Sequence, residues 1–185
     1  MNALKQIEQL QPQEIEKRSF EIIGEELAAR GITLPKDQEM ITKRVIHTSA
    51  DFEYTKTLMY SKDAVRIAQD LICEGADIVT DTNMALAGIN KKALATFGGE
   101  AHCFMADPEV ARIAKERGTT RATVSMEMAA RIDKPVIFAV GNAPTALIQI
   151  DKMMRESNWR PAFVIGVPVG FVNVEAAKEL MIESD

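Results

Sequence analysis

From residue 77 onward, short apolar runs alternate with helical patterns, and this alternation constrains the fold more than any other feature of the chain. Residues 136–140 are continuously apolar, which is typical of a strand buried on both faces of a sheet. Strands alternating with helices imply right-handed crossovers. The pattern predicts an α/β fold, with a three-layer, doubly wound, mainly parallel sheet and helices on both faces. The other predicted strands are 77–80, 102–105 and 162–167, and the predicted helices are 84–87, 108–117, 122–132, 144–155 and 175–182.

Three further helices are predicted ahead of this region, the last of them an amphipathic helix over residues 62–73. Residues 13–30 place Ile15, Ser19, Ile23 and Leu27 in one row, and Gly31 supplies a stop. A hydroxyl on such a stripe needs a partner, either a backbone carbonyl one turn back or a bound molecule. The second helix starts after Pro35 and runs toward residue 47. The sequence contains no repeat or linker, so we predict a single domain over residues 1–185.

Composition excludes several classes of protein. A net charge of −5 with no basic run argues against a nucleic-acid partner. No apolar run approaches the ~20 residues of a membrane span, so we expect no membrane partner. The two cysteines form no Cys-x-x-Cys pair, which fits a cytoplasmic protein and argues against a zinc site. We therefore predict no protein-bound metal.

Arg44 and His47 are the most suggestive polar pair. Met40, Arg44 and His47 follow at steps of four and three, so they share one helical face. Because the chain has only two histidines, proton transfer near neutral pH has few possible carriers. His102 lies in an apolar strand and is interpreted as a structural residue.

Loops at the carboxyl ends of the strands are the expected place for a ligand. Loop 80–84 contains Asp81 and Met84, and loop 166–171 follows the last strand. In loop 141–147, a glycine and a proline favour a tight strand-to-helix turn, with Asn142 or Thr145 satisfying free amides there. Such amides form a site for an anion. Arg121 stands at the start of a predicted helix. The ordinary alternative to a ligand contact is that its charge is simply solvated at the surface.

The residues alone leave the substrate open, since the sequence has no dinucleotide-binding, metalloprotease or nucleophile-elbow motif. Five segments, however, resemble the precorrin-8X methylmutases (precorrin isomerases) of cobalamin biosynthesis. In the family's order they are Lys-Arg-Ser-Phe at 17–20, Arg-Val-Ile-His at 44–47, Thr-Asp-Thr-Asn-Met-Ala-Leu-Ala-Gly-Ile-Asn at 80–90, Gly-Asn-Ala-Pro-Thr-Ala-Leu at 141–147 and Gly-Val-Pro-Val-Gly-Phe-Val at 166–172. Segments 48–52 and 94–100 look like the branch in which cobalt is inserted early.

The resemblance implies an isomerase that moves a corrinoid methyl group from C-11 to C-12. It converts (cobalt-)precorrin-8 to cobyrinate or hydrogenobyrinate and needs no cofactor, since any cobalt belongs to the substrate. His47 matches the catalytic histidine, which protonates the ring C nitrogen or donates a strong hydrogen bond to it. Ser19 and Arg44 match substrate-contacting positions. We add Arg121, Asp81, Met84, Asn142 and Thr145 as predicted contacts with the tetrapyrrole substrate. A homodimer is implied as well.

The sequence departs from the family pattern in two places. The family's C-terminal strand, basic turn and helix have no counterpart before Asp185, and Asn173 stands where the family has glycine, so a different loop backbone is expected. Two alternatives therefore stay open: a corrinoid-binding carrier or inactive truncated homologue without turnover, and an unrelated α/β enzyme that uses the same cleft.

Overall fold

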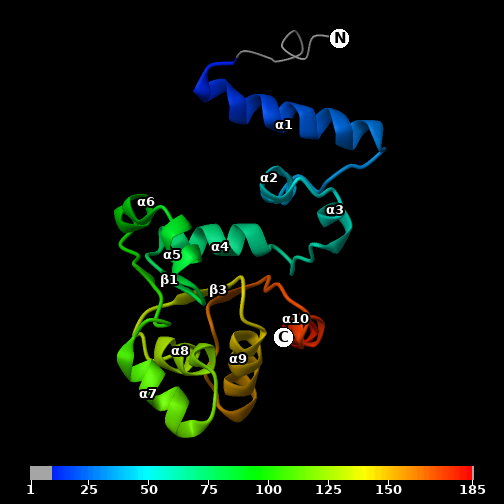
Figure 1. Ribbon diagram of the computed structural model, residues 1–185. Helices are drawn as coiled ribbons and strands as arrows, with labels where there is room; N and C mark the ends of the chain where they lie inside the picture. The colour runs from blue at the N-terminus through cyan, green and yellow to red at the C-terminus, as the bar shows by residue number, and fades with distance from the viewer. Residues whose placement is uncertain (1–9, 185) are drawn as a thin grey trace, which may run out of the picture. The chain divides into compact units, whose positions relative to one another are not determined.

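The computed structural model describes residues 10–184 (Figure 1). The chain divides into two compact units, Met1–Val65 and Arg66–Asp185. We call them the N-terminal unit and the C-terminal unit. No helix among residues 10–184 combines the length and apolar character needed to cross a membrane.

The N-terminal unit is helical. Helix α1 (Pro12–Ala29) begins with proline at its first position and ends before Gly31, whose φ of +67° favours glycine. Helix α2 (Glu39–Ser49) and the short α3 (Tyr54–Thr57) follow. Ile23 and Leu27 of α1 pack with Ile46 of α2, so burial of these side chains holds the two helices together.

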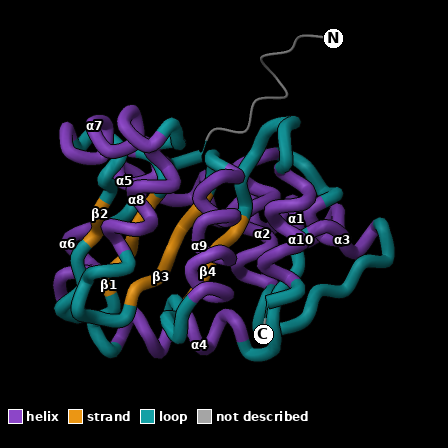
Figure 2. Tube along the Cα trace, turned by 90° about the horizontal axis from the view of Figure 1, so that it is seen from below, coloured by secondary structure: helices purple, strands orange, loops and turns teal. Residues whose placement is uncertain are grey.

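The C-terminal unit contains a parallel sheet in the order β2-β1-β3-β4 (Figure 2). The strands are β1 (Asp77–Thr80), β2 (Ala101–His102), β3 (Val136–Val140) and β4 (Phe163–Gly166). The chain moves from β1 to one neighbour and then returns to the other side of β1. The carboxyl ends of β1 and β3 therefore flank the point where strand order reverses, which is the usual ligand position in such sheets.

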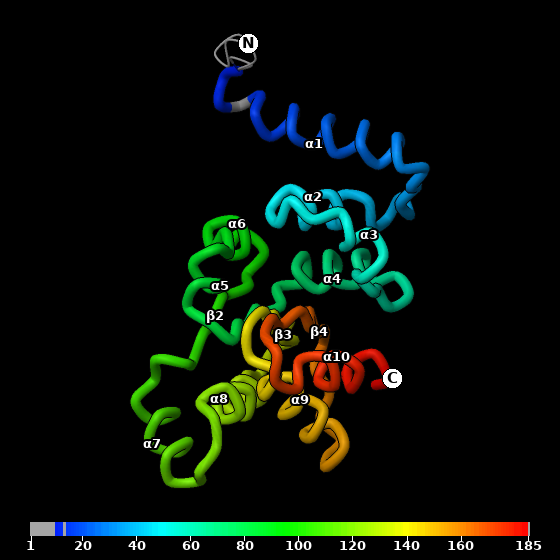
Figure 3. The backbone as a smooth tube through the Cα atoms, turned by 45° about the vertical axis from the view of Figure 1, so that its right-hand side comes forward, coloured from blue at the N-terminus to red at the C-terminus, as the bar shows by residue number. Residues whose placement is uncertain are grey.

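Helices cover both faces of this sheet. In Figures 1 and 3, α4 (Ala64–Cys73) lies on one face, while α8 (Arg121–Ala129) and α9 (Pro144–Glu156) lie on the other. Helix α10 (Val174–Ile182) packs beside α9, and α7 (Pro108–Arg117) packs on α8. The short helices α5 (Asn83–Gly88) and α6 (Lys91–Thr96) complete the unit. The main core forms between the sheet and α8–α10, around Phe138, Met126 and Leu147.

The predicted α/β class with its parallel sheet is confirmed, but details differ. Strand β2 covers two residues rather than 102–105, and α3 and α6 were not predicted. The row predicted on α1 is buried only in its second half, since Ile15 is 53% exposed. Asn173 adopts a left-handed conformation (φ +59°) that asparagine shares with glycine, so this substitution is compatible with a glycine-like loop backbone.

Candidate functional site

The eight predicted site residues fall into two groups. Ser19, Arg44 and His47 belong to the N-terminal unit, where we call them, with Glu16 and Phe20, the helix-pair cluster. The other five belong to the C-terminal unit and form the strand-end group, listed as Asp81, Met84, Arg121, Asn142 and Thr145.

In the helix-pair cluster, the shared face of Arg44 and His47 points outward. Both side chains are exposed, and Met40 on the same face is 64% exposed. Beside His47, the hydroxyls of Thr48 and Ser49 donate to backbone carbonyls one turn back, so both have partners within α2 itself. The imidazole thus belongs to an accessible surface and not to a packed core.

Phe20 of α1 contacts the side chains of both Arg44 and His47 of α2. The Arg44 guanidinium carbon lies 4.8 Å from the Phe20 ring centroid, which is a cation–π contact. The His47 ring lies 5.6 Å from the same ring, with the planes tilted by 49°. The Phe20 ring therefore restricts the positions of the Arg44 guanidinium and the His47 imidazole.

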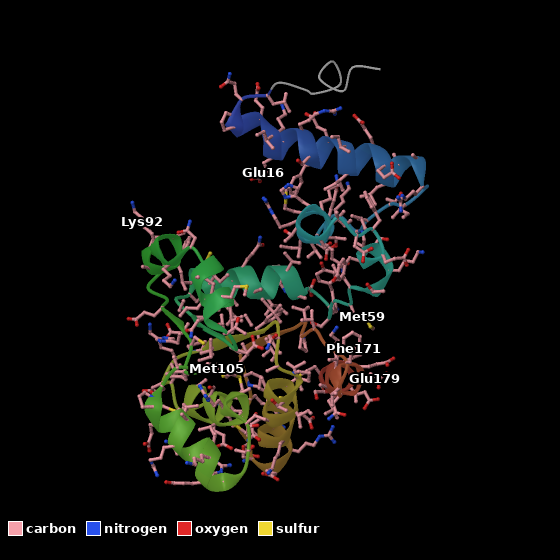
Figure 4. All side chains as sticks on the ribbon, in the orientation of Figure 1. Glu16, Met59, Lys92, Met105, Phe171 and Glu179 are labelled. Atoms are coloured by element: carbon pink, nitrogen blue, oxygen red, sulfur yellow. The ribbon has the colours of Figure 1, made fainter. Side chains whose placement is uncertain are left out.

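Glu16 is the carboxylate partner of Arg44. An Arg44 Nη2–H donates to Glu16 Oε1 at 2.6 Å, joining α1 to α2. Glu16 is labelled in Figure 4. This hydrogen bond, followed by the charge of Arg44, holds the pKa of Glu16 below its usual range; partial desolvation opposes the effect and the charge of His47 adds to it. Glu16 is thus held ionised beside both groups.

Ser19 has the ordinary partner for a helical serine. Its hydroxyl donates to the carbonyl of Ile15 at 2.8 Å, and the residue is half-buried. Of the two partners considered for this hydroxyl, the structure shows the backbone carbonyl. The oxygen retains lone pairs that can accept a hydrogen bond.

Asp81 links the carboxyl ends of β1 and β3, where the strand order of the sheet reverses. It is fully buried, and its carboxylate accepts from the backbone N–H groups of Gly141, Asn142 and Ala143. We predicted that amides of this loop would bind a substrate anion. The carboxylate of Asp81 already occupies these three. The expectation that Asn142 or Thr145 would satisfy them is wrong, because α9 begins without a side-chain cap.

The other members of the strand-end group are accessible. Met84 is 85% exposed in α5, and Asn142 is exposed after β3. Arg121 is exposed at the first position of α8, and within residues 10–184 its guanidinium pairs with no carboxylate. The Thr145 hydroxyl lies 3.0 Å from that of Thr120, the N-cap of α8. The starts of α8 and α9 therefore lie together beside the carboxyl end of β3.

The loop after β4, one of the loops in which a ligand was expected, adds an apolar surface whose residues were not predicted as contacts. Val169, Phe171 and Val172 are exposed, with Phe171 fully so (labelled in Figure 4). Exposed side chains of this size in one loop are typical of a surface that contacts a ligand or another protein.

His102 has a structural setting, as predicted. Its Nε2 lies 2.9 Å from Asp77 Oδ2, and its ring stacks on Phe104. Burial alone would raise the pKa of Asp77, but hydrogen bonds from His102, the Glu100 amide and Lys134 outweigh burial and lower it. This cluster ties β1 to the segments that lead into β2 and β3.

Two cavities lie away from all eight predicted residues. One, of about 420 Å³, lies between α1, α2 and the segment that joins them; the other, of about 390 Å³, lies beside the end of α9. Over the span 10–184, no three metal-ligating side chains gather in one place.

Comparison with known proteins identifies the family. The family model of the precorrin-8X methylmutases matches residues 14–185. The chain belongs to the precorrin-8X methylmutase family. It is 43% identical to the cobalt-precorrin-8 methylmutase of Salmonella typhimurium, covering 94% of this chain and 83% of the relative, and 41% identical to that of Priestia megaterium, covering 92% and 75%.

A solved structure supports the same relation. The precorrin-8X methylmutase of Thermus thermophilus superposes with a TM-score of 0.81 at 36% identity, covering 94% of this chain and 82% of that one. Family membership confirms the predicted class of enzyme, an isomerase of cobalamin biosynthesis. Sequence reasoning had assigned no role to Glu16 or Phe20. Glu16 and Phe20 are four residues apart on α1, which indicates a shared helical face. Their contact with α2 is tertiary and could not be predicted from this spacing.

Proposed function

We propose that this chain moves a methyl group from C-11 to C-12 of a corrinoid ring, converting cobalt-precorrin-8 to cobyrinate. The observation that carries the proposal is an exposed histidine, His47, beside an arginine on one face of α2 in a chain of this family. The two relatives at 41% and 43% identity are both named for the cobalt-containing substrate, which favours that form.

His47 is the proposed general acid. A proton, or a strong hydrogen bond, given to the ring C nitrogen draws electrons from the carbon framework across which the methyl group migrates. The same nitrogen returns the proton after migration, so no reductant and no cofactor are consumed. Positioned acid assistance typically contributes ~10²–10⁴-fold in rate. Histidine suits the task because its ordinary charge change falls near neutral pH.

Arg44 is the proposed anchor for the substrate's carboxylates. A guanidinium presents a planar fork of donors that matches a carboxylate, and the Phe20 ring supports its orientation. Ser19 and Arg121 are proposed as further contacts, and exposed Met84 as an apolar contact for the macrocycle. We propose that the protein acts as a homodimer in the cytoplasm, where its free cysteines stay reduced.

Single-turnover absorbance tests this function. Wild type, His47→Ala and His47→Gln are each mixed in excess with cobalt-precorrin-8. We expect conversion to the cobyrinate chromophore in wild type, and binding without conversion in His47→Ala. Because glutamine donates a hydrogen bond without releasing a proton, its residual rate separates the two roles considered for His47. A wild-type rate in His47→Ala would show that His47 is not the general acid. Binding without conversion in wild type would indicate a carrier.

A further inference from the structure

The contact between Glu16 and Arg44 bears on how the proposed substrate enters. Glu16 Oε1 accepts from Arg44 Nη2 at 2.6 Å, which is the geometry of a charge-assisted pair. A substrate carboxylate bound by Arg44 would use the same donors. The free protein therefore already contains a carboxylate in the position that a substrate carboxylate would take.

We propose that Glu16 is an internal competitor for Arg44, which it occupies in the free protein and releases to a carboxylate of the corrinoid substrate. This inference rests on the proposed function, and it deepens it by naming a residue that sets affinity. Glu16 and Arg44 side chains are 59% and 49% exposed, so the pair can open without unpacking a core. Phe20 keeps its cation–π contact with the guanidinium during the exchange, since the ring and Glu16 approach Arg44 as separate partners.

The competition has a measurable consequence. A site that is free for only a fraction of the time binds its ligand more weakly by that fraction. Exposed ion pairs are individually weak, so we expect removal of the competitor to tighten binding by ~2–5-fold. The neutral isostere Glu16→Gln is the appropriate change because it keeps the side chain's size.

The chain offers a matched control in the same unit. Arg30 stacks on Phe52 at 4.3 Å and pairs with Glu26 of α1 at 2.8 Å, which repeats the glutamate–arginine–phenylalanine arrangement without a histidine. Glu26→Gln therefore removes the same charge from the same helix away from Arg44. Any general relief of repulsion toward an anionic ligand would appear equally in both variants.

The experiment measures the dissociation constant of cobyrinic acid by absorbance titration. Its fully esterified form serves as a ligand without carboxylates. We expect Glu16→Gln to bind cobyrinic acid ~2–5-fold more tightly than wild type, and Glu26→Gln to bind it like wild type. The gain should vanish in an Arg44→Ala background and with the ester, because each lacks one partner of the competition.

Three outcomes are decisive. Equal or weaker binding by Glu16→Gln than by wild type overturns the competitor role, as does an equal gain in Glu26→Gln. Wild type that neither binds cobyrinic acid nor converts cobalt-precorrin-8 instead overturns the proposed function, and the inference with it. Titration of the Glu16 carboxyl by NMR gives a second readout: its lowered pKa should rise toward the ordinary value when cobyrinic acid takes Arg44.

Discussion

Replacement of Asp81 should destabilise the C-terminal unit strongly. In Asp81→Ala, three backbone amides after β3 lose their acceptor. The amide of exposed Asn142 can turn to water, whereas Gly141 and Ala143 are half-buried. At ~1–2 kcal/mol for each of these two donors, the lower part of the range for an unsatisfied group, we expect a loss of about 2–4 kcal/mol. In Asp81→Asn one oxygen still serves two amides, so the expected loss is ~1–2 kcal/mol.

Urea unfolding followed by fluorescence measures this loss. Trp159, the single tryptophan of the sequence, packs edge-on against Phe138 in the core of the same unit. Asp107→Ala is the control, because Asp107 caps α7 on the surface through one amide and should cost only ~1 kcal/mol. If Asp81→Ala unfolds with the same free energy as this control, the three amides do not depend on Asp81 and the reasoning fails.

Three further changes test other parts of the account. Arg44→Ala should raise the dissociation constant for cobyrinic acid ~10-fold and slow single turnover much less; unchanged affinity would count against the anchor. The pKa of Asp77 is lower in the folded state, so its stabilisation is present above the unfolded pKa of ~3.9 and is lost as pH falls through the folded value. When the free energy of unfolding is measured in urea at decreasing pH, Asp77→Asn should therefore lose less stability in acid than wild type. An equal loss in both proteins would contradict this assignment. In Gly99→Ala the new Cβ overlaps the carbonyl oxygen of Ala76, so the melting temperature should fall well below that of Gly88→Ala, whose Cβ meets nothing within 4 Å; equal values would refute the overlap.

Local patterns predicted the sheet well because each strand carries its own signal. Residues 136–140 are apolar without interruption, and the structure places a buried strand at Val136–Val140. Residues 102–105 carry a similar signal, but β2 pairs with β1 only at Ala101 and His102. The length of β2 depends on this pairing with a neighbouring strand, which no local pattern contains.

The candidate site was less accessible to sequence reasoning, for the same reason. Helical spacing placed Arg44 and His47 on one face, and α2 has this arrangement. Spacing could not show that Glu16 would pair with Arg44, since 28 residues separate them. Nor could it show that Asp81 would occupy the amides after β3, because that contact depends on β1 and β3 being neighbours in the sheet.

The proposed reaction is the shift of a methyl group from C-11 to C-12 with the help of His47. Cobalt-precorrin-8 carrying a carbon-13 methyl at C-11, incubated with wild type and with His47→Ala, tests it most directly by NMR. We expect the labelled methyl to move quantitatively to C-12 in wild type and to stay at C-11 in His47→Ala. A label that stays at C-11 in wild type, or moves equally in both proteins, would contradict it.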